Sequence, residues 1–89
     1  MVIKLKYIKT KANVIIAFPA LLEHAQFADF NPVTAGFMSI GTKKVEYSGQ
    51  FYHETDCTCY GESTSLGLKA DEIADSKLAR RQILGHLPE

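Results

Sequence analysis

Hydrophobic and polar residues alternate at the start of the chain. Within residues 2–9, apolar side chains and lysines take turns: Ile3, Lys4, Leu5, Lys6 and Tyr7. A period of two is typical of a strand with one buried face, because successive side chains of a strand point to opposite sides. The break at 10–13 and the apolar run at 14–18 then predict a hairpin of two strands.

Two later segments have helical spacing. Residues 20–29 follow Pro19, which suits the first position of a helix, and they end before the Asn-Pro pair at 31–32. The last helix is predicted to begin after Asp71, a plausible N-cap, and to stop at Gly85.

Alternation returns in the middle of the chain. Residues 34–40 read as a strand, 41–42 as a turn, 43–51 as a second strand and 54–61 as a third. The predicted order is therefore β-β-α-β-β-β-α. It favours an α+β fold in which two helices pack on one face of a single, mainly antiparallel sheet, with residues 1–89 forming one domain.

Composition narrows the range of functions. The chain has 89 residues, of which 46% are hydrophobic, so it supports one modest core that a homodimer interface would supplement. Ten basic residues balance ten acidic ones, whereas nucleic-acid binding relies on a basic excess, so a nucleic-acid partner is disfavoured. Residues 1–50 carry six lysines against three acids, and residues 51–89 carry four basic residues against seven acids. Such a division suits self-association.

The sequence also indicates a location. Two cysteines separated by one residue do not resemble the disulfide framework of a secreted domain. The apolar run near the N-terminus is short, contains Pro19 and follows lysines that alternate with apolar residues, unlike a signal peptide. No segment is long enough to span a membrane. We expect a cytoplasmic protein without membrane contact.

The segment His53–Ser63, "HETDCTCYGES", concentrates the reactive side chains of the chain. Read as a strand, it separates two rows. One row consists of His53, Thr55, Cys57 and Cys59, and the other of Glu54, Asp56, Thr58 and Tyr60. Because cysteine behaves as a small hydrophobic residue, we expect both thiols to face the core while the acids meet water.

Two chemical alternatives remain for this segment. A metal site would use His53, Cys57 and Cys59, with a fourth ligand from elsewhere, such as His24 or His86. A catalytic thiol would need His53 as its base, but the sequence marks no third group to orient that base. We expect no metal and no other cofactor.

The turn after this strand is the candidate binding site. Gly61, Ser63, Thr64 and Ser65 form a small, polar loop that could present hydroxyl and N–H groups to a ligand. The Gly-x-Ser start lacks the second glycine of a nucleophile elbow, and the loop lacks the Gly-Lys-Ser/Thr end of a phosphate-binding P-loop.

Three short motifs carry a resemblance. "PVTAGF" at 32–37, "YGESTSLGLK" at 60–69 and "RRQIL" at 80–84 are similar to segments of short bacterial proteins of uncharacterised function. The run between Val45 and Cys57 is longer than that pattern has. The resemblance implies a small cytoplasmic bacterial protein and brings no known activity or site residues.

Three hypotheses of function follow. The first is a non-enzymatic protein-interaction or regulatory module that binds through a sheet edge or the 60–69 loop, because no catalytic constellation is complete. The second is a small enzyme or ligand-binding protein that uses His53, Cys57 or Cys59 and the 61–65 loop. The third is nucleic-acid binding.

Overall fold

A four-stranded antiparallel sheet forms the body of the protein. The computed structural model describes residues 2–85. The strands of this sheet, in the spatial order β2-β1-β3-β4, are β1 (Ile3–Thr10), β2 (Ile15–Pro19), β3 (Pro32–Tyr47) and β4 (Gln50–Tyr60). The remaining elements are the 3₁₀ helix η1 (His24–Phe30), the short ladder of β5 (Glu62–Ser63) with β6 (Leu68–Lys69), and helix α1 (Glu72–Gln82). The prediction of a mixed fold with a mostly antiparallel sheet is confirmed.

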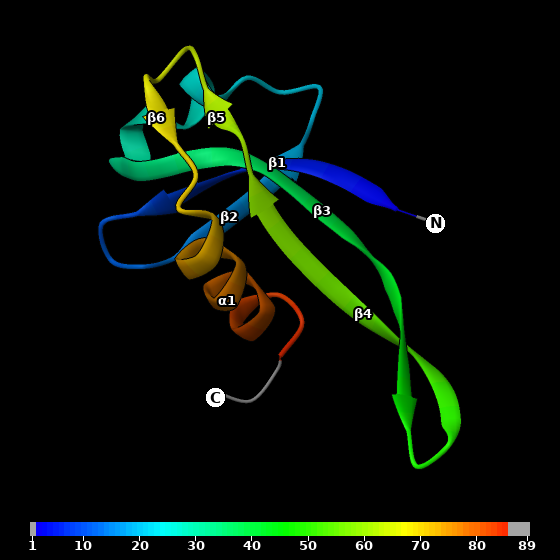
Figure 1. Ribbon diagram of the computed structural model, residues 1–89. Coiled ribbons are helices and arrows are strands. Elements are labelled where there is room, and N and C mark those ends of the chain that lie inside the picture. The colour runs from blue at the N-terminus through cyan, green and yellow to red at the C-terminus, as the bar shows by residue number, and fades with distance from the viewer. Residues whose placement is uncertain (1, 86–89) are drawn as a thin grey trace.

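Helix α1 and η1 contact different hydrophobic clusters. Neighbouring residues of β1 show this division, because their side chains point to opposite faces of the sheet. Tyr7 packs in a cluster that contains Ala79 of α1, whereas Ile8 packs in a cluster joined by Phe27 of η1. Figure 1 shows α1 on one side of the sheet and the β5–β6 ladder at the end of the molecule opposite the turn between β3 and β4. The arrangement thus differs from the predicted one, in which both helices cover the same face.

The first helix also begins later than predicted. Pro19 ends β2 instead of opening a helix, and Leu21 is 93% exposed. A capping box fixes the start of η1: the Glu23 side chain accepts from the Gln26 N–H, and the Gln26 side chain accepts from the Glu23 N–H. This local pair overrides the helical spacing of the leucines.

The turn predicted at 41–42 is wrong. Strand β3 runs through Gly41 without a break, and the hairpin turns at Ser48 and Gly49, whose φ angles are 53° and 77°. Positive φ at both central residues defines the turn whose twist matches that of paired strands. Two of the predicted strands are therefore one strand of 16 residues.

The last helix agrees with its predicted start. The Asp71 side chain accepts a hydrogen bond from the Ala74 N–H at 3.3 Å, which satisfies one of the free donors of the first turn. Gly85 has a φ of 71°, a conformation that glycine adopts without a steric penalty.

The distal half of the β3–β4 hairpin projects from the body. Figure 1 shows the two strands running past α1 to an isolated turn, and the molecule measures 48 × 26 × 16 Å along its principal axes. From residue 42 to residue 55, every side chain except that of Val45 is exposed, although adjacent side chains point to opposite faces. We call residues 42–55 the arm.

Candidate functional site

The cysteines occupy the inner half of β4. Cys57 and Cys59 are fully buried in the cluster that α1 covers, which agrees with the inward orientation expected from the alternation. His53 lies on the arm and is exposed, so the strand separates it from the buried thiols. Within residues 2–85 no group of three or more His, Cys, Asp or Glu side chains is placed to hold a metal ion. His86 lies outside the described residues.

The two buried thiols affect each other's pKa. A hydrogen bond to Cys57 and burial both raise the pKa of Cys59. The same contact lowers the pKa of Cys57 against the opposing effect of burial. A nucleophilic thiol needs access to its substrate as well as a lowered pKa. Both side chains have no exposed surface, so this geometry suits packing and not catalysis.

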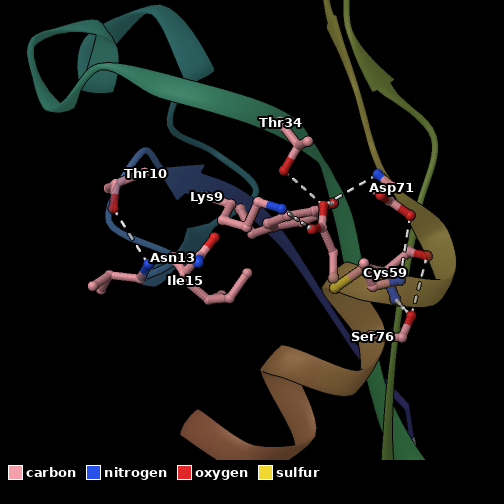
Figure 2. A network of polar contacts seen from close by, with 12 residues as sticks. Lys9, Thr10, Asn13, Ile15, Thr34, Cys59, Asp71 and Ser76 are labelled. Atoms are coloured by element: carbon pink, nitrogen blue, oxygen red, sulfur yellow. Dashed lines mark hydrogen bonds and ion pairs between the residues drawn. The ribbon is translucent and has the colours of Figure 1, made fainter.

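A buried carboxylate next to the thiols ties α1 to the sheet. Asp75 has no exposed surface, and its Oδ2 accepts hydrogen bonds from the hydroxyls of Tyr7, at 2.5 Å, and Thr34, at 2.7 Å. The Asp71 N–H donates to the same oxygen at 3.1 Å, and Lys9 Nζ lies 3.0 Å from Oδ1. Figure 2 shows Lys9, Thr34 and Asp71 converging on this point.

Electrostatics explain why the carboxylate stays charged. Burial acts to raise the pKa of Asp75, but the hydrogen bonds from Tyr7 and Thr34 and the contact with Lys9 outweigh it and hold that pKa below its ordinary value. Burial and the same hydrogen bond raise the pKa of Tyr7. Asp75 Oδ1 has only the ion pair with Lys9 and accepts no hydrogen bond, and the whole network is enclosed, so we assign it a structural role.

Sequence reasoning missed this network. The Lys9 side chain is only 13% exposed because it pairs with Asp75. The alternation could have revealed it, because Lys9 shares the apolar face of Ile3, Leu5 and Tyr7. A lysine on that face needs a buried partner.

The predicted binding loop lines a groove on the face opposite α1. The groove has a volume of about 700 Å³. Its lining includes all four residues singled out from the sequence, together with side chains from β1, β3, the end of β4, and η1 with its N-cap. These residues are Gly61, Ser63, Thr64 and Ser65, with Lys4, Lys6, Glu23, His24, Phe37, Tyr60 and Glu62.

Local structure fixes the shape of the loop. Gly61 has a φ of 79°, and a Cβ there would come within 3.0 Å of the Phe37 ring. Ser63 is buried, and its Oγ accepts from the Leu66 N–H at 3.2 Å and lies 3.3 Å from Ser65 Oγ. The Ser63 hydroxyl is therefore used within the loop, which leaves Thr64 and Ser65 as the exposed hydroxyls.

The charges of the groove are mixed. Lys6 Nζ donates to the Leu22 carbonyl at 2.9 Å and lies 3.8 Å from the Glu23 carboxylate. Lys4 Nζ lies 4.9 Å from the centre of the Phe37 ring. His24, named above as a possible fourth metal ligand, is buried, and its Nε2 lies 2.8 Å from the Gly36 carbonyl oxygen.

The free edge of β4 is the second candidate. Tyr47 and Gln50 flank the two-residue turn and face each other across the ladder. In such a hairpin this pair exchanges both of its hydrogen bonds, and hydrogen-bonded pairs then alternate along the strands. The odd-numbered residues of β4 therefore point their N–H and C=O groups away from β3.

Helix α1 closes the inner part of this edge. The Cys59 N–H donates to Ser76 Oγ at 2.8 Å, as the alternation requires (Figure 2). Arg80 Nε donates to the Asp56 carboxylate at 2.8 Å. Burial acts to raise the pKa of Asp56, but the Cys57 N–H and Arg80 outweigh it and hold that pKa below its ordinary value.

The outer part of the edge is open. β4 is the terminal strand of the sheet, and within residues 2–85 no other segment pairs with the outward N–H and C=O groups of Phe51, His53 and Thr55. Large apolar side chains surround them: Tyr47 is 71%, Phe51 60% and Tyr52 49% exposed. The arm thus combines an unpaired backbone edge with exposed aromatic rings.

Comparisons with known proteins identify no relative of this chain. Searches of protein families, of curated proteins and of solved structures each found no significant match to the chain. Among the helices of the described residues, none has the length and apolar character needed to cross a membrane.

Proposed function

We propose that this protein is a non-enzymatic interaction module that binds an extended polypeptide segment along the free edge of its arm. The observation that carries the proposal is the row of outward-pointing backbone groups at Phe51, His53 and Thr55. Adding a strand to such an edge satisfies those groups through main-chain hydrogen bonds.

The contrast along β4 supports this function. Proteins generally protect edge strands with charges, bulges or a covering element, because an open edge pairs with other chains. Here Ser76 and Arg80 of α1 occupy the edge at Cys59 and Asp56. Between residues 51 and 55 the described part of the chain supplies no equivalent cover.

The side chains indicate what kind of segment fits. Tyr52 lies opposite Val45 on the face away from α1, with Tyr47 on the same face, whereas Phe51 lies on the other face. Lys44 Nζ lies 4.1 Å from the centre of the Phe51 ring and positions it. A bound strand would therefore place apolar residues beside aromatic rings on both of its faces.

A peptide selection with two matched variants tests the proposal. A displayed library of random peptides is selected on the wild-type chain, and each binder is then measured against Thr55→Pro and Thr55→Ala. Proline removes an outward N–H without breaking the ladder to β3, whereas alanine removes the side chain and keeps the N–H.

We expect binders that lose at least about ten-fold in affinity on Thr55→Pro and less than about three-fold on Thr55→Ala, since one lost backbone bond contributes roughly that difference. Protection of the Phe51, His53 and Thr55 amides from hydrogen exchange on peptide addition checks the same point in the wild type. Binders that protect only other regions contradict the proposal.

The groove supports a second candidate function, binding of a small anionic molecule that has a flat ring. The observation in its favour is that Lys4, Lys6 and the exposed hydroxyls of Thr64 and Ser65 line the same groove as the Phe37 ring. Titration with 4-hydroxybenzoate, followed by NMR, tests it. Saturable shifts of the groove amides that disappear in Lys4→Met support this function, and shifts unchanged by that substitution contradict it.

A further inference from the structure

The free edge of the arm can pair with the same edge of a second copy of the chain. We infer that the segment bound by the arm is the same edge of a second copy of this chain, paired antiparallel about a two-fold axis through His53. This inference rests on the proposed function, because it names the occupant of the strand edge described above.

Backbone geometry limits the registers of such a pair. Only odd-numbered residues of β4 point their N–H and C=O groups outward, so odd residues of one copy must face odd residues of the other. An axis through His53 places Phe51 opposite Thr55 of the second copy and His53 opposite its own counterpart. All three open residues of both copies are then paired.

The neighbouring registers are worse for identifiable reasons. An axis through Tyr52 leaves Thr55 opposite the Gly49 turn and without a partner strand. An axis through Glu54 opposes two carboxylates at the closest type of pair, where like charges are destabilising. It also brings Phe51 to Cys57, beside the point where Arg80 contacts Asp56 at the edge.

The chosen register also avoids opposed carboxylates. Tyr52 faces Glu54 of the second copy, and Gln50 faces Asp56, so each carboxylate meets a neutral side chain. The turn of the second copy reaches the position opposite Cys57, at the level where Arg80 contacts Asp56, and stops short of Cys59, where Ser76 covers the edge. Helix α1 therefore sets how far the two arms can overlap.

Sedimentation of the wild-type chain gives the first test. We expect a monomer–dimer equilibrium at concentrations up to about 1 mM, a range in which weak complexes become populated. Thr55→Pro removes a donor on both sides of the axis and should raise the dissociation constant at least about ten-fold, while Thr55→Ala changes it less than about three-fold.

Single cysteines then report the axis. Across a hydrogen-bonded pair the Cα atoms lie about 5.5 Å apart, within reach of a disulfide. Under mild oxidation His53→Cys should therefore form a covalent dimer. Phe51→Cys and Thr55→Cys should not do so alone, because each residue lies about 13 Å from its own counterpart in this register. A mixture of these two variants should cross-link.

The outcomes separate the inference from the proposed function. The wild-type chain is the control for cross-linking, since Cys57 and Cys59 are fully buried. A wild type that stays monomeric at the highest concentration, or Phe51→Cys cross-linking alone as readily as His53→Cys, overturns the paired-arm inference. If selected peptides still protect the arm amides in that case, the edge binds a different polypeptide and the proposed function stands.

Discussion

The two halves of the β3–β4 hairpin share one ladder but differ in what lies behind it. In the inner half, Met38 faces Cys59 and both side chains are buried beneath α1. In the arm, Tyr52 faces Val45 in the same ladder, and no layer covers either face. A regular ladder therefore does not by itself indicate a packed sheet.

The same boundary divides the free edge of β4. Where α1 backs the sheet, Ser76 and Arg80 also occupy the edge, so one helix supplies both the apolar cover and the polar groups. From Thr55 toward the turn, β4 has neither the apolar cover nor the polar groups that α1 supplies. The inner half is therefore expected to determine the stability of the fold, and the arm its interactions.

The largest expected difference between the two halves is in the stability lost when a lysine that pairs with an aspartate is replaced. Lys9→Met removes the ammonium beside the buried Asp75 carboxylate and should lower the free energy of unfolding by about 3–5 kcal/mol, because a buried charge then lacks its partner. Urea denaturation measures the change.

Lys43→Met in the arm is the matched control. Lys43 lies 3.9 Å from Asp56 with its side chain 58% exposed, so its removal should cost less than about 1 kcal/mol. The double variant Lys9→Met with Asp75→Asn should recover much of the lost stability. Equal costs for the two lysines would contradict the division between core and arm.

A second pair of substitutions compares apolar residues of one strand. Met38→Ala opens a cavity in the core and should cost about 2–5 kcal/mol. Val45→Ala lies on the same strand within the arm and should cost less than about 1 kcal/mol, since little apolar surface is buried there. Thermal or urea unfolding of both variants measures whether side chains contribute less to stability where no helix covers the ladder.

Acid should destabilise the inner half first. The pKa of Asp75 is lower in the folded protein than in the unfolded chain, so its charge stabilises the fold above the unfolded value of about 3.9. That stabilisation is lost as the pH falls through the folded pKa. The effect should be smaller than that of Lys9→Met, because protonation neutralises the carboxylate instead of leaving it without a counterion.

Asp75→Asn identifies the source of this pH dependence. Its urea midpoint should be lower than that of the wild type at neutral pH and should vary less between neutral and acidic pH. Tracking unfolding by the amides of α1 and of the arm separates the two halves. An unchanged acid dependence in Asp75→Asn would assign the effect to other carboxylates.

The period-two alternation predicted much of the fold. It placed Cys57 and Cys59 on a buried face and located the first hairpin, because side-chain alternation is a property of the strand itself. It misplaced the turn, because Gly41 resembles a turn residue but fits within β3, while Ser48–Gly49 lay inside an apparently regular strand. The position of η1 depends on the Glu23–Gln26 capping box, which outweighed the leucine spacing.

The candidate sites were less accessible from the sequence. The loop at Gly61–Ser65 was identified, but its lysines come from β1 and its ring from β3, which only the tertiary structure brings together. Binding through a sheet edge was a hypothesis from the sequence, but which edge is open could not be predicted, because that depends on which strand is outermost and on where α1 ends. Neither property is encoded in a local pattern.

The smallest expected effect concerns the turn of the arm. Ser48 adopts a φ of 53°, a conformation that asparagine tolerates better than serine, and Asn-Gly is the preferred pair for this turn. Ser48→Asn should therefore stabilise the arm by less than about 1 kcal/mol, within the penalty for a left-handed residue. Gly49→Ala should destabilise it by about 1–2 kcal/mol for the same reason.

These changes should appear in the arm alone. The arm has no apolar cover, so it can open without exposing the core, and its amides report a local free energy. Hydrogen exchange at Tyr52 and Glu54, which bond to β3, should slow by up to about five-fold in Ser48→Asn and accelerate in Gly49→Ala. The urea midpoint followed at α1 should not move in either variant. A shift of that midpoint by Gly49→Ala would show that the two halves unfold together, and the contrast between them would then concern exposure and not stability.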